Sequence, residues 1–382
     1  MKLSFKRIVS SGNFIPEIDG LRFIAITSIV LFHLSGFLSA KNINHDSDAI
    51  DFSFLKHLLS HGHLGVPLFF VISSFILGIP FAKFHLRNGN PVSIKNYFLR
   101  RLTRLEPPYI LVMTILLFGA VYVAKTISLE TGMESFFYSI IYSHNFIPLS
   151  TLPNLNGVTW SLEIEIQFYI LAPLLAYVFS IKSSFIRRIT LLLMAILFLF
   201  LTHFYFNSLH FISLLNYFHF FLMGFLLADL YISEQLLLPF KKYDFLIGLF
   251  LFLTIWLFEK QDFDSNTLLF MWELIQIVCI FFLYYYILFH KIFKFLSLKL
   301  ITNIGGMCYS IYLLHFPIIS MFGNYLLKYS FSKYTFVDVS IYSLILLLLI
   351  MGISSIFFLF VERPCMDKDW FKKLRKSCFN AV

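Results

Sequence analysis

The chain has 382 residues, of which 59% are hydrophobic and only 13% are charged. Soluble domains carry about a quarter charged residues, so this composition excludes an ordinary soluble domain and indicates a polytopic membrane protein. The formal net charge of +9 could suggest a nucleic-acid partner. We expect no nucleic acid, because the basic residues follow the pattern of membrane topology.

Apolar runs long enough to cross a bilayer recur along the whole chain. They predict an all-α polytopic membrane protein with about ten transmembrane helices in one bundle. The expected spans lie near residues 20–40, 64–84, 108–128, 160–180, 189–207, 211–232, 244–259, 268–290, 309–328 and 336–361. The expected organisation is a cytoplasmic segment at 1–19, a transmembrane domain at 20–364 and a short basic cytoplasmic tail at 365–382.

The lysines and arginines predict the orientation of these spans. If the N-terminus is cytoplasmic, about 23 of the 30 basic residues fall in inner segments, as the positive-inside rule requires. Both termini are therefore expected in the cytoplasm. The first apolar run is too long for the apolar region of a signal peptide and is expected to be retained. None of the four cysteines lies in an expected outer loop, so we expect no disulfide framework.

Two ionisable residues, Arg22 and His33, share the first apolar run. Ionisable groups inside a span are costly and usually functional. Eleven helical positions bring the two side chains to one face, roughly 16 Å apart along the axis. His33 lies roughly 20 Å into a membrane core about 30 Å thick. Histidine can take a proton from a hydroxyl at neutral pH, although a packing histidine with a hydrogen bond to a neighbouring helix is the plain alternative.

A basic cluster lies between the second and third expected spans. Arg100, Arg101 and Arg104 precede Pro107 and Pro108, which we expect to start the next helix. Arg101 and Arg104 are three residues apart and share a helical face. Arginine forks suit phosphate oxygens, so the cluster is a candidate site for a phosphorylated donor such as acyl-coenzyme A. The alternative is simple anchoring at the inner membrane surface.

Glu163 and Glu165 open the fourth expected span near the outer boundary, at about the depth of His33. Two residues apart on a helix, they diverge by about 200°, so they are not expected to form a carboxylate pair. One of them is expected to face the bundle and to orient a histidine, as the third member of a catalytic relay does. The alternative is two interfacial carboxylates in contact with water.

Other polar residues in the apolar segments give weaker signals. His61 and His63 are spaced as metal ligands, but no third ligand is evident, so we expect no metal site. Ser73 and Ser74 are better explained by helix packing than by nucleophilic catalysis. His315, early in the ninth expected span, is as readily explained by helix packing as by function.

Together these segments resemble the acyltransferase-3 family of integral-membrane O-acyltransferases, which modify surface glycans and other exported molecules. The matching motifs in chain order are Arg22 with His33; Arg101, Arg104, Pro107 and Tyr109; Trp160, Ser161, Leu162, Glu165, Phe168 and Tyr169; Tyr309 through Pro317; and Glu362 through Pro364. One departure is Ser74, where the family usually has glycine. A side chain there narrows either a helix crossing or the acyl channel.

The resemblance implies transfer of an acyl group, expected to be acetyl, from cytoplasmic acyl-coenzyme A to a hydroxyl of a glycan or lipid-linked glycan such as O-antigen, lipopolysaccharide or capsule. Acetyl-coenzyme A is then a substrate, with no bound cofactor. The resemblance also implies a bacterial inner membrane. Because the chain ends soon after the last expected span, we expect it to lack the extracytoplasmic domain that some members carry. The assignments are His33, Glu165 and Glu163 as catalytic residues, Arg22, Arg100, Arg101 and Arg104 as donor-binding residues, and Trp160, Tyr169, Ser73 and His315 as substrate-pocket candidates.

Two other functions remain open from the residues. A carrier or flippase for a lipid-linked glycan or an anion would also need many spans and internal charges, but the chain has no internal repeat and no matched pair of broken spans. A membrane sensor or interaction protein would suit the basic surface but leaves His33 unexplained.

Overall fold

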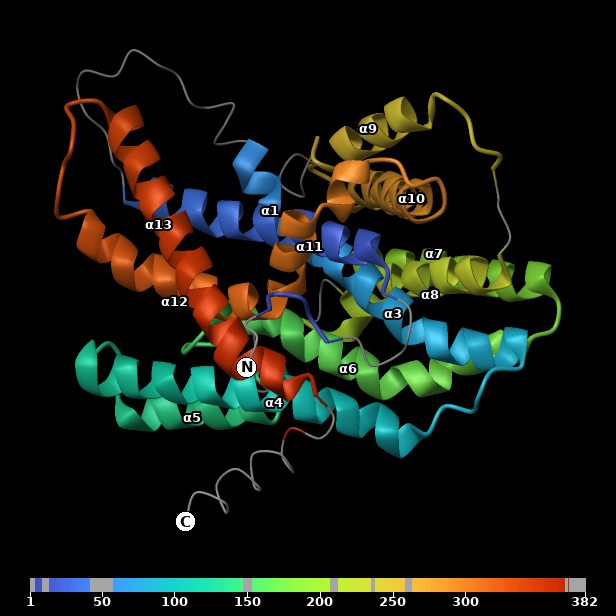
Figure 1. The fold of residues 1–382 in the computed structure, drawn as a ribbon, viewed down its shortest axis with the longest axis horizontal. Helices are drawn as coiled ribbons and strands as arrows, with labels where there is room; N and C mark the ends of the chain where they lie inside the picture. The colour runs from blue at the N-terminus through green and yellow to red at the C-terminus, as the bar shows by residue number, and fades with distance from the viewer. Residues whose placement is uncertain are drawn as a thin grey trace.

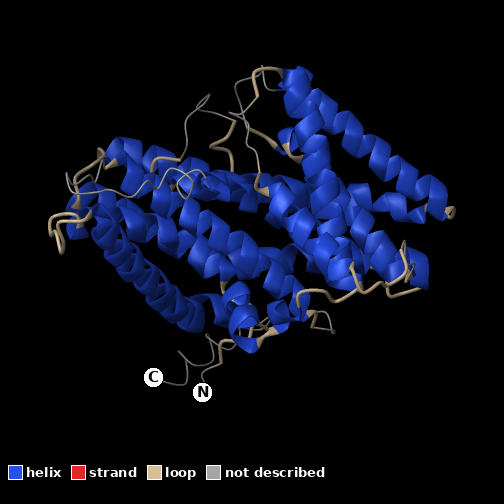
Figure 2. Ribbon diagram, turned by 90° about the horizontal axis from the view of Figure 1, so that it is seen from above, coloured by secondary structure: helices blue, strands red, loops and turns tan. Residues whose placement is uncertain are grey.

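The computed structural model describes most of the chain as helices, and the described part contains no strand (Figures 1 and 2). The described residues are 4–8, 14–41, 58–146, 153–206, 212–234, 238–257, 263–367 and 370. Most of the expected tail at 365–382 and part of the segment at 1–19 lie outside these ranges, so the three expected domains stay a prediction.

Seven helices among the described residues are long and apolar enough to cross a membrane. The α-helices that form these spans are α1 (Pro16–Ala40), α3 (Gly65–Arg87), α4 (Ile94–Phe118), α6 (Trp160–Leu175), α7 (Ser184–Phe204), α10 (Asn266–Phe289) and α13 (Thr335–Phe357). The helices α11 (Lys299–Gly306) and α12 (Cys308–Leu326) form an eighth candidate, bent by 68°. The expected all-α polytopic membrane fold is confirmed.

Apart from the three-residue helix α14 (Arg363–Cys365), three further α-helices among the described residues are shorter than a span. They are α5 (Leu129–Ile140), α8 (Phe218–Ser233) and α9 (Asp244–Ile255). The helices α8 and α9 are apolar but shorter than a full span, and both were expected as spans. The expected total of about ten spans, which includes them, stays a prediction.

Helix α1 runs through the centre of the molecule and packs against α3, α11 and α12 (Figure 1). On one side of it α12 packs against α13, and on another α10 packs against α9. Helices α4 and α5 lie together along one edge, and α8 packs between α3 and α7. The charged first turns of α1 are therefore enclosed by neighbouring helices instead of facing lipid.

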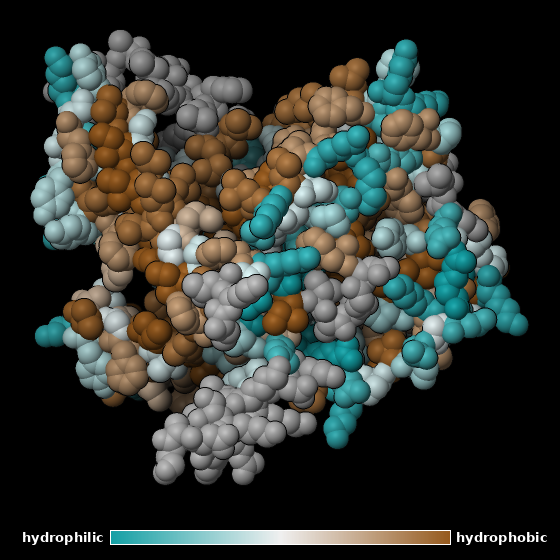
Figure 3. Space-filling view, in the orientation of Figure 1, coloured by the Kyte–Doolittle hydropathy of each residue, from teal (hydrophilic) through white to brown (hydrophobic). Residues whose placement is uncertain are grey.

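The outer surface of the bundle is largely apolar. On the face shown in Figure 3, hydrophobic side chains cover the region over α12 and α13, whereas hydrophilic side chains gather over the middle of the molecule. Leu344, Leu348 and Ile356 of α13 are exposed. A helix with such a surface satisfies its backbone internally and can face lipid.

Helix α4 begins earlier than the sequence predicts. It starts at Ile94, so Pro107 and Pro108 lie inside it instead of at its first turn. The side chain of Ser93 caps this start by accepting a hydrogen bond from the backbone N–H of Asn96 at 3.4 Å. The expectation was wrong because a serine cap outweighed the proline signal. The basic cluster is therefore carried on a helix, where its spacing fixes which side chains share a face.

Ser74 lies on the crossing of α3 and α8, where the two backbones approach closely. A Cβ atom on Gly224 of α8 would lie 1.9 Å from the Ser74 Oγ and 2.4 Å from the carbonyl oxygen of Val71. Only glycine fits opposite the serine at this separation. Of the two readings of the Ser74 departure, the structure supports the narrowed helix crossing.

Buried charges away from the centre are paired. Asp229 of α8 receives hydrogen bonds from Arg187 and from Arg188, the second at 2.8 Å, and so joins α8 to α7. His290 and Asp244 join α10 to α9 through a 2.6 Å contact. Pairing is what makes such groups tolerable within an apolar bundle.

The first and last described segments meet at one end of the bundle. The Arg363 guanidinium donates a hydrogen bond to the carbonyl oxygen of Lys6 at 3.2 Å. This contact brings the segment before α1 and the end of the α13 span to the same side, as the expected topology requires. Placement of that side in the cytoplasm stays a prediction.

Candidate active site

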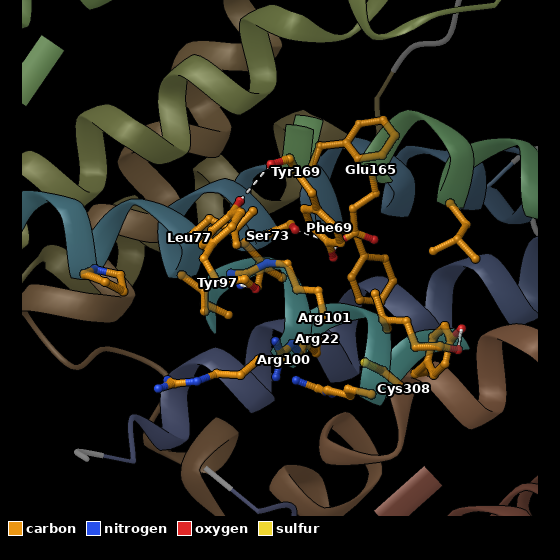
Figure 4. Close-up of a pocket in the computed structure, with 18 of the residues that line it drawn as sticks. Arg22, Phe69, Ser73, Leu77, Tyr97, Arg100, Arg101, Glu165, Tyr169 and Cys308 are labelled. Atoms are coloured by element: carbon orange, nitrogen blue, oxygen red, sulfur yellow. Dashed lines mark hydrogen bonds between the residues drawn. The ribbon is translucent and has the colours of Figure 1, made fainter. Parts of the chain in front are cut away.

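A cavity of about 510 Å³ opens between α1, α3, α4 and α6, and arginines line one part of it (Figure 4). We call this cavity the arginine pocket. Its arginines are Arg7, Arg22, Arg100, Arg101 and Arg104. Four of them were proposed as donor-binding residues from the sequence, and α1 and α4 bring these four together. A volume of this size is typical of small-molecule sites.

Arg101 is held between two tyrosines. Its guanidinium lies 3.8 Å from the ring centroid of Tyr97 and 5.4 Å from that of Tyr169. It also donates a hydrogen bond to the carbonyl oxygen of Tyr97 at 2.9 Å. The Tyr97 hydroxyl in turn donates to the carbonyl oxygen of Tyr169 at 3.0 Å, which ties α4 to α6 (Figure 4). Cation–π contacts fix the arginine while its remaining N–H groups can still bind an anion.

A buried carboxylate, Asp19, orients two other arginines. One of its oxygens accepts a hydrogen bond from Arg22 at 2.8 Å, and the other accepts one from Arg7 at 2.8 Å. Burial and the nearby Arg22 lower the pKa of Arg7 to about 10, which still leaves it protonated at neutral pH. Asp19 therefore assembles a pair of positive groups that would repel each other without it.

Arg104 has a side-chain donor that no described residue uses. Its Nε is buried and has no hydrogen-bond partner among the described residues. The nearby Glu362 interacts electrostatically with Arg104 but is held by Ser310, whose N–H and hydroxyl donate to it at 3.0 and 2.5 Å. A buried donor without a partner carries a desolvation penalty that a bound anion would remove.

Of the two glutamates, Glu165 faces the arginine pocket. It accepts hydrogen bonds from the hydroxyls of Ser73 and of Tyr169, the latter at 2.5 Å. Glu163 is fully buried on another side of α6 and accepts from the backbone N–H of Asn145 at 2.9 Å. The divergence expected for residues two apart is observed. Because of this divergence, Glu165 lines the pocket, whereas Glu163 holds the loop at Asn145.

His33 lies outside the arginine pocket, at a second cavity of about 310 Å³ with an aromatic wall. The residues lining this cavity are Phe32, His33, Gly36, Phe37, Phe316, Ile319 and Ser320. The ring of His315 of α12 lies against His33, with the ring centroids 5.2 Å apart. We call His33 and His315 the histidine pair.

The arginine pocket ends about one helical turn short of the histidine pair. Ile29, four residues before His33 on α1, lines the pocket, and so does Tyr312, three residues before His315 on α12. One turn rises about 5.4 Å. The Tyr312 hydroxyl lies 3.1 Å from the Ser161 hydroxyl, which also borders the pocket. Two hydroxyl groups thus border the arginine pocket, and one of them belongs to the residue one helical turn before His315.

Several sequence candidates do not line the arginine pocket. Trp160 is instead packed near Tyr217, with ring centroids 5.6 Å apart, and its carbonyl accepts a hydrogen bond from Asn145. The ring of His63 lies 5.5 Å from that of Phe32. In the part of the chain that the structure describes, no three His, Cys, Asp or Glu side chains form a group suited to a metal.

Sequence reasoning missed Arg7 as a pocket residue. It was counted among the basic residues that mark the inner side of the membrane. No local motif links it to the basic cluster of α4, because its place depends on the packing of the segment before α1 onto Asp19. A signal that could have pointed to Arg7 is Asp19, an acidic residue in the first turn of an otherwise apolar helix.

Comparison with known proteins places these features in a family. A family model described as "Acyltransferase domain" matches residues 15–361. The chain belongs to this acyltransferase family. The resemblance inferred from the five motifs is therefore confirmed, and the member is a multi-pass membrane protein.

Two relatives of the chain are named as O-acetyltransferases. The chain is 26% identical over 401 residues to the O-acetyltransferase OatA of Staphylococcus aureus (strain NCTC 8325 / PS 47), covering 96% of this chain and 60% of the relative. It is 27% identical over 177 residues to the peptidoglycan O-acetyltransferase OatA of Listeria monocytogenes, covering 44% of this chain and 25% of the relative. The chain thus spans at most 60% of the length of either relative. No solved structure matches.

Proposed function

We propose that this protein is a membrane-bound O-acyltransferase. It moves an acetyl group from coenzyme A, bound in the arginine pocket, to a hydroxyl of a glycan that enters from the opposite side of the membrane. The single observation that carries the proposal is the convergence of five arginines on one cavity whose far end approaches a membrane-embedded histidine. The relatives named as O-acetyltransferases support the choice of acetyl and of a hydroxyl acceptor.

The arginines suit the phosphates of coenzyme A. Arginine binds phosphate oxygens with paired, charge-assisted hydrogen bonds. Arg101 is oriented by tyrosines, Arg22 and Arg7 by Asp19, and Arg104 has an unused buried donor. With the phosphates there, the pantetheine arm can extend past Ser73 and Tyr169, and the thioester then lies near the hydroxyls of Ser161 and Tyr312.

His33 is proposed as the general base. It removes the proton from the acceptor hydroxyl as the hydroxyl oxygen attacks the thioester carbonyl carbon. A carbon–oxygen ester bond forms, the carbon–sulfur bond breaks, and the proton passes from His33 to the departing thiolate of coenzyme A. A positioned base of this kind contributes about 10²–10⁴-fold to the rate. Transient attachment of the acyl group to His33 is the alternative within the same function.

The remaining assignments follow from this geometry. Glu165, bonded to Ser73 and Tyr169, is proposed to shape the path of the pantetheine arm. Glu163 is proposed to secure the loop at Asn145 instead of acting on the substrate. The acceptor is proposed to be a surface or exported glycan, and the location the inner membrane of a bacterium with the arginine pocket toward the cytoplasm.

Membranes containing the protein test the proposal when they are incubated with acetyl-coenzyme A labelled in the acetyl group. The expected result is label in an alkali-labile ester on glycan, and no label with His33→Ala inserted to the same level. Passage of a glycan or an anion without ester formation would instead identify a transporter. Comparing surface polysaccharide with and without the gene by mass spectrometry then identifies the acceptor.

A further inference from the structure

His315 is a fully buried side chain whose surroundings fix its hydrogen-bonding state. It lies on α12, and its Nδ1 is 2.9 Å from the carbonyl oxygen of Ile311 and 2.8 Å from that of Tyr312. Both neighbours are acceptors only, so Nδ1 must carry the hydrogen. In the neutral ring, Nε2 then has a free lone pair.

That lone pair has no partner among the described residues. The Nε2 atom of His315 is buried and receives no hydrogen bond from the described protein. Buried polar atoms are almost always satisfied, and the exceptions call for an explanation. A packing histidine would gain nothing from an unsatisfied nitrogen, and a phenylalanine would fill the same space without the penalty.

The group that can satisfy it is His33. The two ring centroids are 5.2 Å apart, and the planes are inclined by 47°. Two imidazoles joined nitrogen to nitrogen by a hydrogen bond of about 3 Å have a centroid separation of about this size once the ring radii are added. A small rotation of the His33 ring completes the bond, and hydrogen bonds of catalytic groups often tighten only when substrate binds.

We propose that His315 is a positioning residue for His33, an inference that rests on the proposed function. The Nε2 atom of His315 accepts the N–H of His33. This fixes the His33 tautomer, so its other nitrogen presents a lone pair to the acceptor hydroxyl. When His33 takes the hydroxyl proton, the same bond stabilises the resulting imidazolium. A third group that holds a catalytic histidine in one tautomer is the general logic of nucleophile–base–orienter relays.

This assignment gives His33 the orienting partner that the sequence assigned to a glutamate. In the described structure, Glu165 accepts hydrogen bonds from the hydroxyls of Ser73 and Tyr169. Glu163 accepts one from the backbone N–H of Asn145. The neighbour of His33 is instead an imidazole on α12. Its Nδ1 is anchored by two carbonyls, as an orienting residue requires.

Two matched variants test the role. His315→Gln keeps a hydrogen-bond acceptor near the position of Nε2. His315→Asn keeps a donor near the position of Nδ1 but has no acceptor near that of Nε2. We expect His315→Asn to lower kcat by about 10–100-fold, the loss found when the hydrogen-bond partner of a metal-ligating histidine is removed. His315→Gln should retain most of kcat, and the KM for acetyl-coenzyme A should be unchanged in both. The double variant His33→Ala/His315→Asn should be no slower than His33→Ala.

A spectroscopic measurement is independent of turnover. In ¹⁵N NMR of histidine-labelled protein, the resonances assigned to His33 by comparison with His33→Ala should report one tautomer in the wild type and a mixture in His315→Asn. Equal kcat for His315→Gln and His315→Asn at wild-type level, or an unchanged His33 tautomer, overturns the inference. Absence of transfer by the wild type under all acyl donors instead overturns the proposed function.

Discussion

The arginine pocket and the histidine pair lie about one helical turn apart and are built in opposite ways. In the pocket, most charged groups have protein partners that orient them, such as Asp19 for Arg22 and Tyr97 for Arg101. In the pair, the His33 ring contacts Phe32 and Phe316, and before the proposed rotation of that ring no hydrogen bond joins the two histidines in the described structure. The first arrangement suits tight binding of a highly charged molecule, and the second suits a change of protonation.

Under the proposed function, this contrast separates donor binding from chemistry within one bundle. A strongly basic site at the depth of His33 would disfavour the imidazolium that forms when His33 takes a proton. Ile29, Ser161 and Tyr312 line the pocket, and His33 lies outside it, so the arginines act on the proposed base from a greater distance, at which their interaction with it is weaker. Substitutions in the pocket should therefore change donor affinity, and substitutions in the pair should change turnover.

The largest effect is expected for His33→Ala. Removal of the proposed general base should lower kcat by about 10²–10⁴-fold, while the affinity for coenzyme A stays within about twofold because His33 is outside the arginine pocket. Turnover with labelled acetyl-coenzyme A and equilibrium binding of coenzyme A, both in detergent, measure the two quantities. A variant that turns over at the wild-type rate would remove His33 from the chemistry.

Arg104→Ala should show the reverse pattern. A hydrogen bond to a charged group is worth about 1.5–3 kcal/mol, so the Kd for coenzyme A should rise by about 10–100-fold. The kcat at saturating donor should change little. Arg104→Lys keeps the charge but not the planar guanidinium. Its Kd for coenzyme A should therefore lie between those of the wild type and Arg104→Ala. Unchanged affinity in Arg104→Ala, with the protein folded, would place the phosphates elsewhere.

Arg7→Ala should have a smaller effect, because the Nε of Arg7 already donates a hydrogen bond to Asp19 and fewer of its N–H groups are left for an anion. Contacts of partly exposed charges are worth about 1 kcal/mol or less, so the Kd should rise by less than about tenfold. The pKa of Arg7, lowered to about 10 by burial and by Arg22, keeps its charge near neutral pH. Its contribution is lost only as the pH rises through that value. Lys6→Ala is the matched control, because Lys6 lies over Phe14 and not in the pocket.

The smallest effect is expected for Ser74→Gly, and the adjacent serine provides the contrast. Ser74 faces Gly224 on α8, so Ser74→Gly should leave both kcat and donor affinity unchanged. Ser73→Ala removes a hydrogen bond to Glu165 in the pocket and should weaken donor binding by up to about tenfold. Measuring coenzyme A binding of the two variants side by side checks this. Equal effects from the two serines would contradict the assignment of Ser74 to helix packing.

The pocket was largely predictable from the sequence, because its arginines lie in local motifs. The spacing of Arg101 and Arg104 and the place of Arg22 in an apolar run are visible without a structure. Even there the start of α4 was misplaced, since two prolines signalled a helix start that the Ser93 cap sets elsewhere. Arg7 was missed because its position depends on contact with Asp19, which no spacing reveals.

The partner of His33 could not be predicted, because it comes from a helix far along the chain. His33 and His315 are brought together by the packing of α1 on α12, a long-range contact that helical periodicity does not encode. From the sequence, the expected depth in the membrane suggested a glutamate of α6 as the partner of His33. The structure instead shows that the pair of glutamates is divided between the pocket and a loop.

The most direct test is a structure of the protein with a non-hydrolysable thioether analogue of acetyl-coenzyme A, determined by cryo-electron microscopy. The account predicts the phosphates among Arg22, Arg101 and Arg104, with the acetyl group beyond Ser161 and within reach of His33. Phosphates bound outside the arginine pocket, or an acetyl group pointing away from α1, would contradict it.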